Sequence, residues 1–361
     1  MSPRFHDLTV EQIERQTSDS AILGFAIPDD LKAAFAFNPG QYLTLAASVD
    51  GEEIRRSYSI CSTPDDTLLK VGIKKVDDGR FSCFVNDRLA IGDRLRVMPP
   101  EGRFTPRLGA GETQDFLLIA AGSGITPMLA IAASVLARNG RNSVTLIYGN
   151  RATENIMFRE DLQDLKDRHL GRFTLVHVLS REKQDVDLLN GRIDGARIAA
   201  MAQKGLIDPA AADGIFLCGP GEMIDDVSAT LRSLGIDETK IRFERFTPTG
   251  EPALRRAPSK AVQQAVEQGA EIEVVLDGVR RNFTMGDAQN SILDAANSAG
   301  IDLPFSCAGG MCCTCRCRVM EGSAEMAVNY SLEKWETEAG FTLACQARPT
   351  SNRLVLDFDA S

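Results

Sequence analysis

Five of the nine cysteines lie between Cys307 and Cys317, and this cluster is the clearest chemical signal in the sequence. Cys307, Cys312 and Cys315 follow the pattern C-x4-C-x2-C, and Cys345 comes after 29 further residues. This is the plant-type spacing of the ligands of a [2Fe-2S] cluster. An odd, clustered set of cysteines also argues against a disulfide framework and for a metal site in a reducing compartment. We therefore expect an iron-sulfur protein of the cytoplasm.

A zinc site is the main alternative for these thiolates. Structural zinc sites usually hold their ligands in two pairs with separations of about two to four residues, whereas Cys345 stands alone. A Rieske centre is excluded because it needs two histidine ligands. The histidines of the chain, none of them near the cysteines, are His6, His169 and His177. We favour the [2Fe-2S] cluster over zinc and interpret Cys313 and Cys317, which lie outside the spacing, as bystanders.

Two short motifs in the first third of the chain carry the groups that a nucleotide with a flat heterocycle needs. In Arg56-Ser57-Tyr58-Ser59 a guanidinium can pair with a pyrophosphate, a phenol ring can stack on the heterocycle and a hydroxyl can bond to it. Gly79-Arg80-Phe81-Ser82 opens a predicted helix, whose first N–H groups can bind a phosphate. Either motif alone is more often structural, but the two together favour binding. The candidate residues here are Arg56, Tyr58, Ser59, Gly79, Phe81 and Ser82.

A glycine turn, residues 122–127 (GSGITP), follows a predicted strand and opens a predicted helix. At the start of a parallel sheet this is where a nucleotide phosphate binds. Asn150-Arg151 and Ser180-Arg181 each follow a strand, where an acidic residue would select the bare ribose of NAD. Arginine suits a 2′-phosphate instead and favours NADPH, although solvated surface arginines are the alternative. The candidate residues are Gly122, Ser123, Gly124, Thr126, Asn150, Arg151, Ser180 and Arg181.

A further strand of this region ends at Cys218-Gly219-Pro220-Gly221. No histidine accompanies Cys218, so we interpret it as a soft side chain beside a nicotinamide and not as a nucleophile. Gly219 and Pro220 join the same expected cofactor site. Phe246, in the segment Glu244-Arg245-Phe246, either covers the bound heterocycle until nicotinamide displaces it or simply packs in a terminal strand.

The elements around these motifs predict three domains. Residues 1–108 contain six short strands separated by turns and one short helix, which predicts an antiparallel β-barrel. Residues 112–247 alternate continuous apolar strands with helices, which predicts a parallel sheet covered on both faces. Residues 270–361 begin with a hairpin, continue with a helix and end with returning strands, which predicts a small α+β domain of the β-grasp kind. Residues 248–269 are interpreted as a linker that lets this last domain swing.

The charge balance and the apolar stretches narrow the class of partner. A net charge of −10 argues against a protein that binds nucleic acid through a strongly basic surface. Residues 270–361 hold 13 acidic and 7 basic side chains and so carry −6 of that charge. This charge would steer the docking of the last domain on a partner protein, and the effect would weaken as the salt concentration rises. Residues 116–137 have no formal charge, but Gly122, Gly124 and Pro127 interrupt them, so we expect no membrane span.

The segments RSYS, GRFS, GSGITP, CGP and ERF and the four spaced cysteines occur in the order seen in one family. The chain resembles the ferredoxin-NADP reductase superfamily with a plant-type ferredoxin domain fused at its C-terminus. A narrower resemblance, to the reductase components of phenylacetyl-CoA 1,2-epoxidases, is carried by FNPGQYLTL, RRSYSIC, AAGSGITPMLAI, LIYGNR, DLLNGRID, VNYSLE, LACQARP and LVLDFD. One departure is Cys313, where the family usually has Gly, Ala, Ser or Thr.

The resemblance implies an oxidoreductase with three redox groups. The first motifs would hold FAD, the glycine turn and the arginines NADPH, and the four spaced cysteines the cluster, with Ser59 and Cys218 at the reacting centre. NADPH gives up two electrons and a cluster accepts one, so a flavin must stand between them. The implied partner is a diiron oxygenase that acts on phenylacetyl-CoA. Two alternatives are the same chemistry serving another aromatic or steroid oxygenase, and a flavin and iron-sulfur redox sensor.

Overall fold

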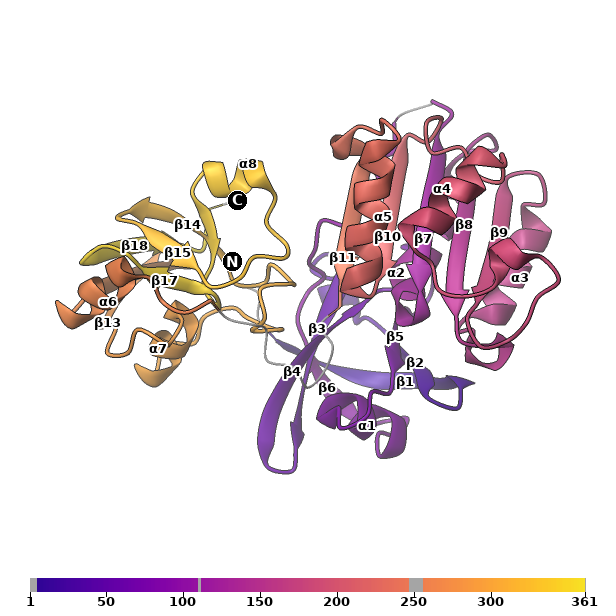
Figure 1. Ribbon diagram of the computed structural model, residues 1–361. Coiled ribbons are helices and arrows are strands. Elements are labelled where there is room, and N and C mark those ends of the chain that lie inside the picture. The colour runs from indigo at the N-terminus through magenta and orange to yellow at the C-terminus, as the bar shows by residue number, and fades with distance from the viewer. Residues whose placement is uncertain (1–4, 110–111, 247–255, 361) are drawn as a thin grey trace. The chain divides into compact units, whose positions relative to one another are not determined.

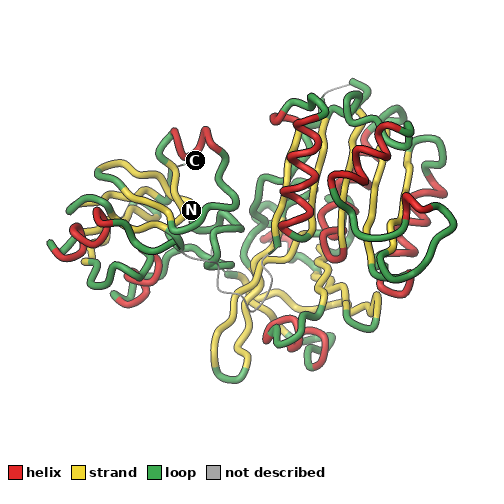
Figure 2. Tube along the Cα trace, viewed as in Figure 1, coloured by secondary structure: helices red, strands yellow, loops and turns green. Residues whose placement is uncertain are grey.

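The computed structural model describes residues 5–109, 112–246 and 256–360, which form two compact units. The larger, called here the reductase unit, contains His6–Ile54 and Tyr58–Phe246. The smaller, called here the C-terminal unit, is built mainly from the described residues after 255. Figures 1 and 2 show a region rich in strands at the start of the reductase unit, followed by a region in which strands and helices alternate.

The first region of the reductase unit is an antiparallel sheet closed into a barrel. In the order of pairing its strands are β4 (Glu52–Ser59), β3 (Tyr42–Val49), β6 (Arg94–Val97), β1 (His6–Thr17), β2 (Ser20–Phe25) and β5 (Leu69–Lys74). A bridge between Ile60, which follows β4, and Val71 of β5 joins the two edges. Helix α1 (Arg80–Asp87) buries Phe81 and Val85, one turn apart, in the barrel core. The predicted barrel and its one short helix are therefore confirmed.

The second region is a five-stranded sheet in which every neighbouring pair is parallel. In the order of pairing its strands are β11 (Ile241–Arg245), β10 (Gly214–Gly219), β7 (Asp115–Ala121), β8 (Ser143–Asn150) and β9 (Phe173–Leu179). The helices between the strands are α2 (Ile125–Arg138), α3 (Arg159–Arg168), α4 (Gly195–Gln203) and α5 (Gly221–Ser233). The predicted doubly covered parallel sheet is confirmed.

Alternate residues of the central strand β7 explain the layers. Leu118 and Ala120 share one apolar core with α2 and α3, whereas Leu117 and Ile119 share the opposite core with α4 and α5. Figure 1 shows α4 and α5 together in front of the sheet. Because helices cover both faces, the edge at the carboxyl ends of the strands is where a ligand can approach.

The glycine turn after β7 owes its path to two missing side chains. A Cβ added to Gly124 would lie 2.1 Å from the backbone oxygen of Cys218, so only glycine lets the start of α2 pass this close to the end of β10. Gly122 has a φ of +55°, and a Cβ added to it would meet nothing within 4 Å. The turn is therefore packed on one side and open on the other.

The C-terminal unit is a mixed sheet with short helices. In the order of pairing its strands are β13 (Val279–Thr284), β12 (Glu271–Leu276), β18 (Arg353–Asp357), β14 (Arg316–Glu321) and β16 (Phe341–Leu343), and β15 (Ala324–Met326) pairs separately with β17 (Ala347–Pro349). Strands β12 and β18 are parallel, and helix α7 (Ile292–Ser298) supplies Ile292, Leu293 and Ala296 to the core. The β-grasp arrangement predicted for this domain is confirmed.

Helix α6 (Lys260–Glu267) corrects the predicted linker. Residues 260–267 lie inside the segment interpreted as a coil, yet they form a helix whose N-cap is Ser259, and Val262 and Ala265 are buried against the C-terminal unit. The apolar residues of KAVQQAVE recur at helical spacing, which the prolines around them obscured. Residues 247–255 of the predicted linker lie outside the described residues.

In the described part of the chain, no helix has the length and apolar character needed to cross a bilayer. The uncharged stretch 116–137 is divided between β7, the glycine turn and α2.

Candidate functional site

The loops after β8 and β9 bring two predicted arginines to the same edge of the parallel sheet. The backbone N–H of Ser180 donates to the carbonyl of Asn150 at 3.0 Å, and that of Arg181 donates to the carbonyl of Arg151 at 2.7 Å. These bonds continue the pairing of β8 and β9 beyond the strand ends. Arg151 and Arg181 are therefore neighbours, although 30 positions separate them in sequence.

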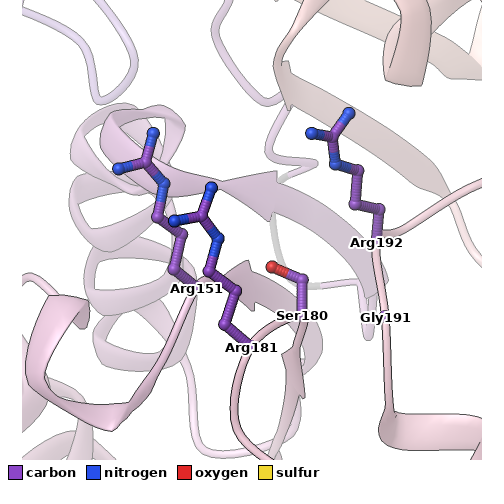
Figure 3. Close-up of a pocket in the computed structure, with 5 residues that line it drawn as sticks. All are labelled: Arg151, Ser180, Arg181, Gly191 and Arg192. Carbon is purple, nitrogen blue, oxygen red and sulfur yellow. The ribbon is translucent and has the colours of Figure 1, made fainter.

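A third arginine, which sequence reasoning missed, completes this site. Gly191 donates its N–H to the carbonyl of Leu179 at 2.7 Å and has a φ of +110°, so the chain turns there and places Arg192 beside the end of β9. A cavity of about 290 Å³ is lined by Arg151, Ser180, Arg181, Gly191 and Arg192. Figure 3 shows the three arginine side chains extending toward the same side of the cavity, with Arg192 across from the other two.

The arginine cavity has the chemistry of an anion site. Three exposed guanidinium groups and one hydroxyl surround it, and no carboxylate lines it. Guanidinium groups bind phosphate through paired N–H donors. Asn150, which was predicted to belong here, is buried at the end of β8 and does not line the cavity. The signal for Arg192 was the Asn190-Gly191 turn directly before it.

The glycine turn presents backbone and not side-chain groups. The hydroxyl of Thr126 donates to the carbonyl of Ser123 at 2.9 Å, and Thr126 is buried. The phenol of Tyr148, on β8, donates to the carbonyl of Gly122 at 3.1 Å and so helps to hold the turn in place. The N–H of Ile125, the first residue of α2, already donates to the carbonyls of Gly122 and Ser123. A phosphate could approach the N-terminal turn of α2 beside the open space at Gly122.

A hydrogen bond between Ser59 and Glu244 joins the barrel to the parallel sheet. Ser59 Oγ, at the end of β4, donates to Glu244 Oε2 at 2.9 Å. Glu244 lies on β11, directly opposite Cys218 on β10. The two residues expected at the reacting centre, Ser59 and Cys218, therefore lie on either side of a carboxyl that sequence reasoning left without a role.

Burial changes the proton affinity of this group of side chains. Desolvation raises the pKa of the Glu244 carboxyl to about 7, although the hydrogen bond from Ser59 acts in the opposite direction. The pKa of the Cys218 thiol is raised well above its usual range, by burial first and then by the nearby Glu244. A shift in this direction disfavours the thiolate, which is the nucleophilic form of cysteine.

The Cys218 side chain, which we expected beside a nicotinamide, has no exposed surface in this structure. Cys218 is fully buried and belongs to the apolar core beneath α2, against which Phe246 also packs. Phe246 is half-buried, and its role at the bound heterocycle stays a prediction. Gly219 ends β10, and Pro220 is the exposed N-cap of α5, so these two residues reach the edge of the sheet.

The barrel brings its two predicted nucleotide motifs together. The rings of Tyr58 and Phe81 lie 5.8 Å apart, so the ends of β4 and α1 are adjacent. Phe81 is buried, and the hydroxyl of Ser82 donates to the carbonyl of Gly79 at 3.0 Å, so these side chains shape the loop. The half-buried ring of Tyr58 and the N-terminus of α1 remain as the surfaces that can meet a ligand, and Arg56 is exposed.

The four predicted cluster ligands form two pairs. Cys307 is hydrogen-bonded to Cys312, and Cys315 is hydrogen-bonded to Cys345. In the part of the chain that the structure describes, no three His, Cys, Asp or Glu side chains converge on a single point that could hold one metal ion. The two irons of a [2Fe-2S] cluster divide four cysteines between them, and the two thiol pairs fit that division.

The backbone of the cysteine loop also fits a cluster. The N–H groups of Gly309 and Met311 point at Cys307 Sγ, at 3.3 and 3.4 Å. Together with the hydrogen bond from Cys312 they lower the pKa of the Cys307 thiol to about 6, against the effect of burial. Such donors stabilise thiolate sulfur. Ala308 and Cys313 have left-handed φ values of +48° and +59°, which is uncommon outside glycine.

The two cysteines of the cluster region that lie outside the spacing have other surroundings. Cys317 is fully buried and its thiol faces the carbonyl of Thr342 at 3.9 Å. Cys313 is half-buried inside the loop. Their interpretation as bystanders stays a prediction.

Family models match all three regions of the chain. The oxidoreductase FAD-binding domain matches residues 7–105, the oxidoreductase NAD-binding domain matches residues 118–229, and the 2Fe-2S iron-sulfur cluster binding domain matches residues 274–350. These three matches correspond to the barrel, the parallel sheet and the C-terminal unit. The chain is an oxidoreductase with sites for FAD, a nicotinamide nucleotide and a [2Fe-2S] cluster.

Curated relatives match the chain along its whole length. It is 44% identical to one of the proteins that make up 1,2-phenylacetyl-CoA epoxidase in Escherichia coli K12, over 99% of this chain and 98% of that one. It is 36% identical to the ferredoxin reductase component of 3-ketosteroid-9-alpha-monooxygenase from Rhodococcus rhodochrous, over 97% and 96%.

A solved structure shows the same fold. Phthalate dioxygenase reductase superposes with a TM-score of 0.57 at 22% identity, over 98% of both chains. With the three domain matches and the full-length relatives, the chain belongs to the family of oxygenase reductase components that join an FAD-binding domain, an NAD-binding domain and a C-terminal 2Fe-2S domain.

Proposed function

We propose that this protein is the reductase component of a phenylacetyl-CoA epoxidase and delivers electrons from NADPH to a diiron oxygenase. The observation that carries the proposal is the 44% identity, over 99% of the chain, to the Escherichia coli component of 1,2-phenylacetyl-CoA epoxidase. The reductase would not contact the aromatic substrate itself. Nine free cysteines suit a reducing compartment, which supports a cytoplasmic location.

The reductase unit would bind both nucleotides. Tyr58 and the N-terminus of α1 would hold FAD, and the turn at Gly122 would hold the pyrophosphate of the nicotinamide nucleotide. Arg151, Arg181 and Arg192 would bind its 2′-phosphate, which makes NADPH the preferred donor. When bound, the flavin supplies the change from two-electron to one-electron transfer.

Three side chains would prepare the place where the two nucleotides meet. Ser59 orients the carboxyl of Glu244 by a hydrogen bond, and Glu244 stands beside Cys218 at the end of β10. A carboxyl with a pKa of about 7 can hold or release a proton under physiological conditions. The buried thiol of Cys218 keeps this corner apolar and free of water.

A steroid-oxidising system is the second candidate partner. The 36% identity to the reductase of 3-ketosteroid-9-alpha-monooxygenase covers 97% of the chain, so the same three domains also serve that oxygenase. The cavity and the cysteine pairs do not separate the two systems, because both need the same electron route.

Coupled turnover tests the partner. The purified protein is combined with NADPH and the oxygenase of either phenylacetyl-CoA epoxidase or 3-ketosteroid-9-alpha-monooxygenase, and the oxidised product is measured. We expect product only with phenylacetyl-CoA and its epoxidase. Product only in the steroid reaction would show that the protein serves 3-ketosteroid-9-alpha-monooxygenase instead. NADPH oxidation without product in either reaction would point to another oxygenase as the partner.

The arginine cavity predicts the choice of nicotinamide nucleotide. Arg181→Ala removes a charge-assisted contact worth about 1.5–3 kcal/mol, so kcat/KM for NADPH should fall about 10- to 150-fold while that for NADH changes little. Arg192→Ala should act in the same direction. Arg168→Ala, at the end of α3 and outside the cavity, is the matched control. Equal losses with both nucleotides would contradict a 2′-phosphate site.

The cysteine pairs predict which thiol is needed for the cluster. Cys312→Ser should abolish the visible absorption of the cluster, because it breaks one pair, while reduction of a flavin-level acceptor by NADPH persists. Cys313→Ser changes the next residue of the same loop and leaves the two pairs, Cys307 with Cys312 and Cys315 with Cys345, intact. This variant should keep the cluster. A cluster that survives Cys312→Ser but not Cys313→Ser would reverse the ligand assignment.

Glu244 predicts a distinctive pH dependence of stability. The unfolded chain releases this proton near pH 4.5, whereas the folded protein holds it to about pH 7. Between these values the folded state binds more protons, so this group makes the free energy of unfolding fall as the pH rises. Glu244→Gln removes that titration, and its stability relative to wild type should increase from pH 5 to pH 8.

Urea unfolding at several pH values measures this difference. Glu222→Gln, an exposed position on α5, is the control and should parallel wild type throughout. Wild-type and Glu244→Gln curves that remain parallel from pH 5 to pH 8 would show that Glu244 has an ordinary pKa.

A further inference from the structure

Gln346 connects the two chain segments that carry the cysteine pairs. It directly follows Cys345, and the residue is 1% exposed. Its Nε2 donates to the carbonyl of Ala308 at 3.0 Å, in the loop of the first three cysteines, and to Cys345 Sγ at 3.6 Å. The two hydrogens of one amide nitrogen thus reach both segments.

The packing around Gln346 leaves little freedom for its side chain. A Cβ added to Gly310 would lie 3.0 Å from Gln346 Cγ, so the loop closes directly over this side chain. The backbone N–H of Gln346 donates to Leu343, and its carbonyl accepts from Ala327. Gln346 is therefore held both by its backbone hydrogen bonds and by those of its side-chain nitrogen.

The oxygen of the same amide shows that stability alone does not explain the residue. Gln346 Oε1 is buried and has no hydrogen-bond partner among the described residues. An unpaired buried acceptor destabilises the folded state. A methionine would fill the same space without that cost. The donor end of the amide must therefore contribute something that an apolar side chain would not.

We propose that Gln346 is a positioning residue that holds Cys345 against the cysteine loop and raises the reduction potential of the cluster. Reduction adds one negative charge, which is shared with the cysteine sulfurs. A donor to Cys345 Sγ stabilises that charge more than it stabilises the oxidised form, and hydrogen bonds to sulfur are a recognised determinant of potential. The inference rests on the proposed assignment of Cys345 as a ligand.

Redox titration of Gln346→Met tests the proposal. The variant keeps the length of the side chain and removes the donor. At a fixed potential the ratio of reduced to oxidised cluster should fall by up to about tenfold, which is about 59 mV for a one-electron couple, and the EPR g values of the reduced protein should shift. Gln263→Met is the matched control, because its Nε2 donates to Pro258, just before α6, and contacts no cysteine. An unchanged potential and spectrum in a fully loaded Gln346→Met protein would refute the proposal.

A second measurement needs no variant. Wild-type protein is made by cell-free synthesis with glutamine labelled with 15N in the side-chain amide, and the reduced cluster is examined by pulsed EPR. We expect a weak 15N coupling, and its absence would refute the proposal even if Gln346→Met fails to retain iron. The ligand assignment is tested separately, because a cluster that persists in Cys345→Ala would overturn the assignment itself.

Discussion

Two stretches of chain that are far apart in sequence must hold four thiols within reach of one another, and the C-terminal unit is built around this constraint. The loop of Cys307, Cys312 and Cys315 adopts left-handed backbone at non-glycine positions, which is tolerated only where the surroundings fix it. Directly after the loop, Arg316 pairs with the buried Glu336 at 2.9 Å and lies over the ring of Phe341. These contacts anchor the start of β14 to α8 (Lys334–Glu338) and β16, and so bring the loop back toward Cys345.

The reductase unit must bring side chains from separate loops together at one edge of its parallel sheet. A parallel sheet covered on both faces exposes only the ends of its strands, and the useful side chains must come from the loops there. Backbone hydrogen bonds beyond the ends of β8 and β9 bring Arg151 and Arg181 together, and the absence of a side chain at Gly124 lets the glycine turn approach β10. The bond from Ser59 to Glu244 then fixes the barrel against this edge. The proposed nucleotide sites would thus be positioned by backbone geometry more than by side-chain packing.

The sequence predicted the elements well because their hydrophobic periods are regular. All the strands and helices expected in the reductase unit are present, and the cysteine spacing led directly to the domain that the 2Fe-2S family model matches.

Sequence reasoning missed Arg192, Glu244 and Gln346, whose roles depend on residues distant in the chain. Pairing between strands places Glu244 beside Cys218, and closure of a loop places the amide of Gln346 beside a sulfur. Neither relation has a local signal. The burial of Cys218 was missed for the same reason, since the pattern gives the end of a strand but not what packs over it.

The central claim is that this single chain carries electrons from a nicotinamide nucleotide to a cluster held by its paired cysteines. EPR spectroscopy of samples frozen during the first turnover with NADPH, in the absence of any oxygenase, tests it most directly. The account predicts that the signal of a reduced [2Fe-2S] cluster appears as NADPH is consumed. NADPH consumption with a loaded cluster that stays oxidised would contradict it.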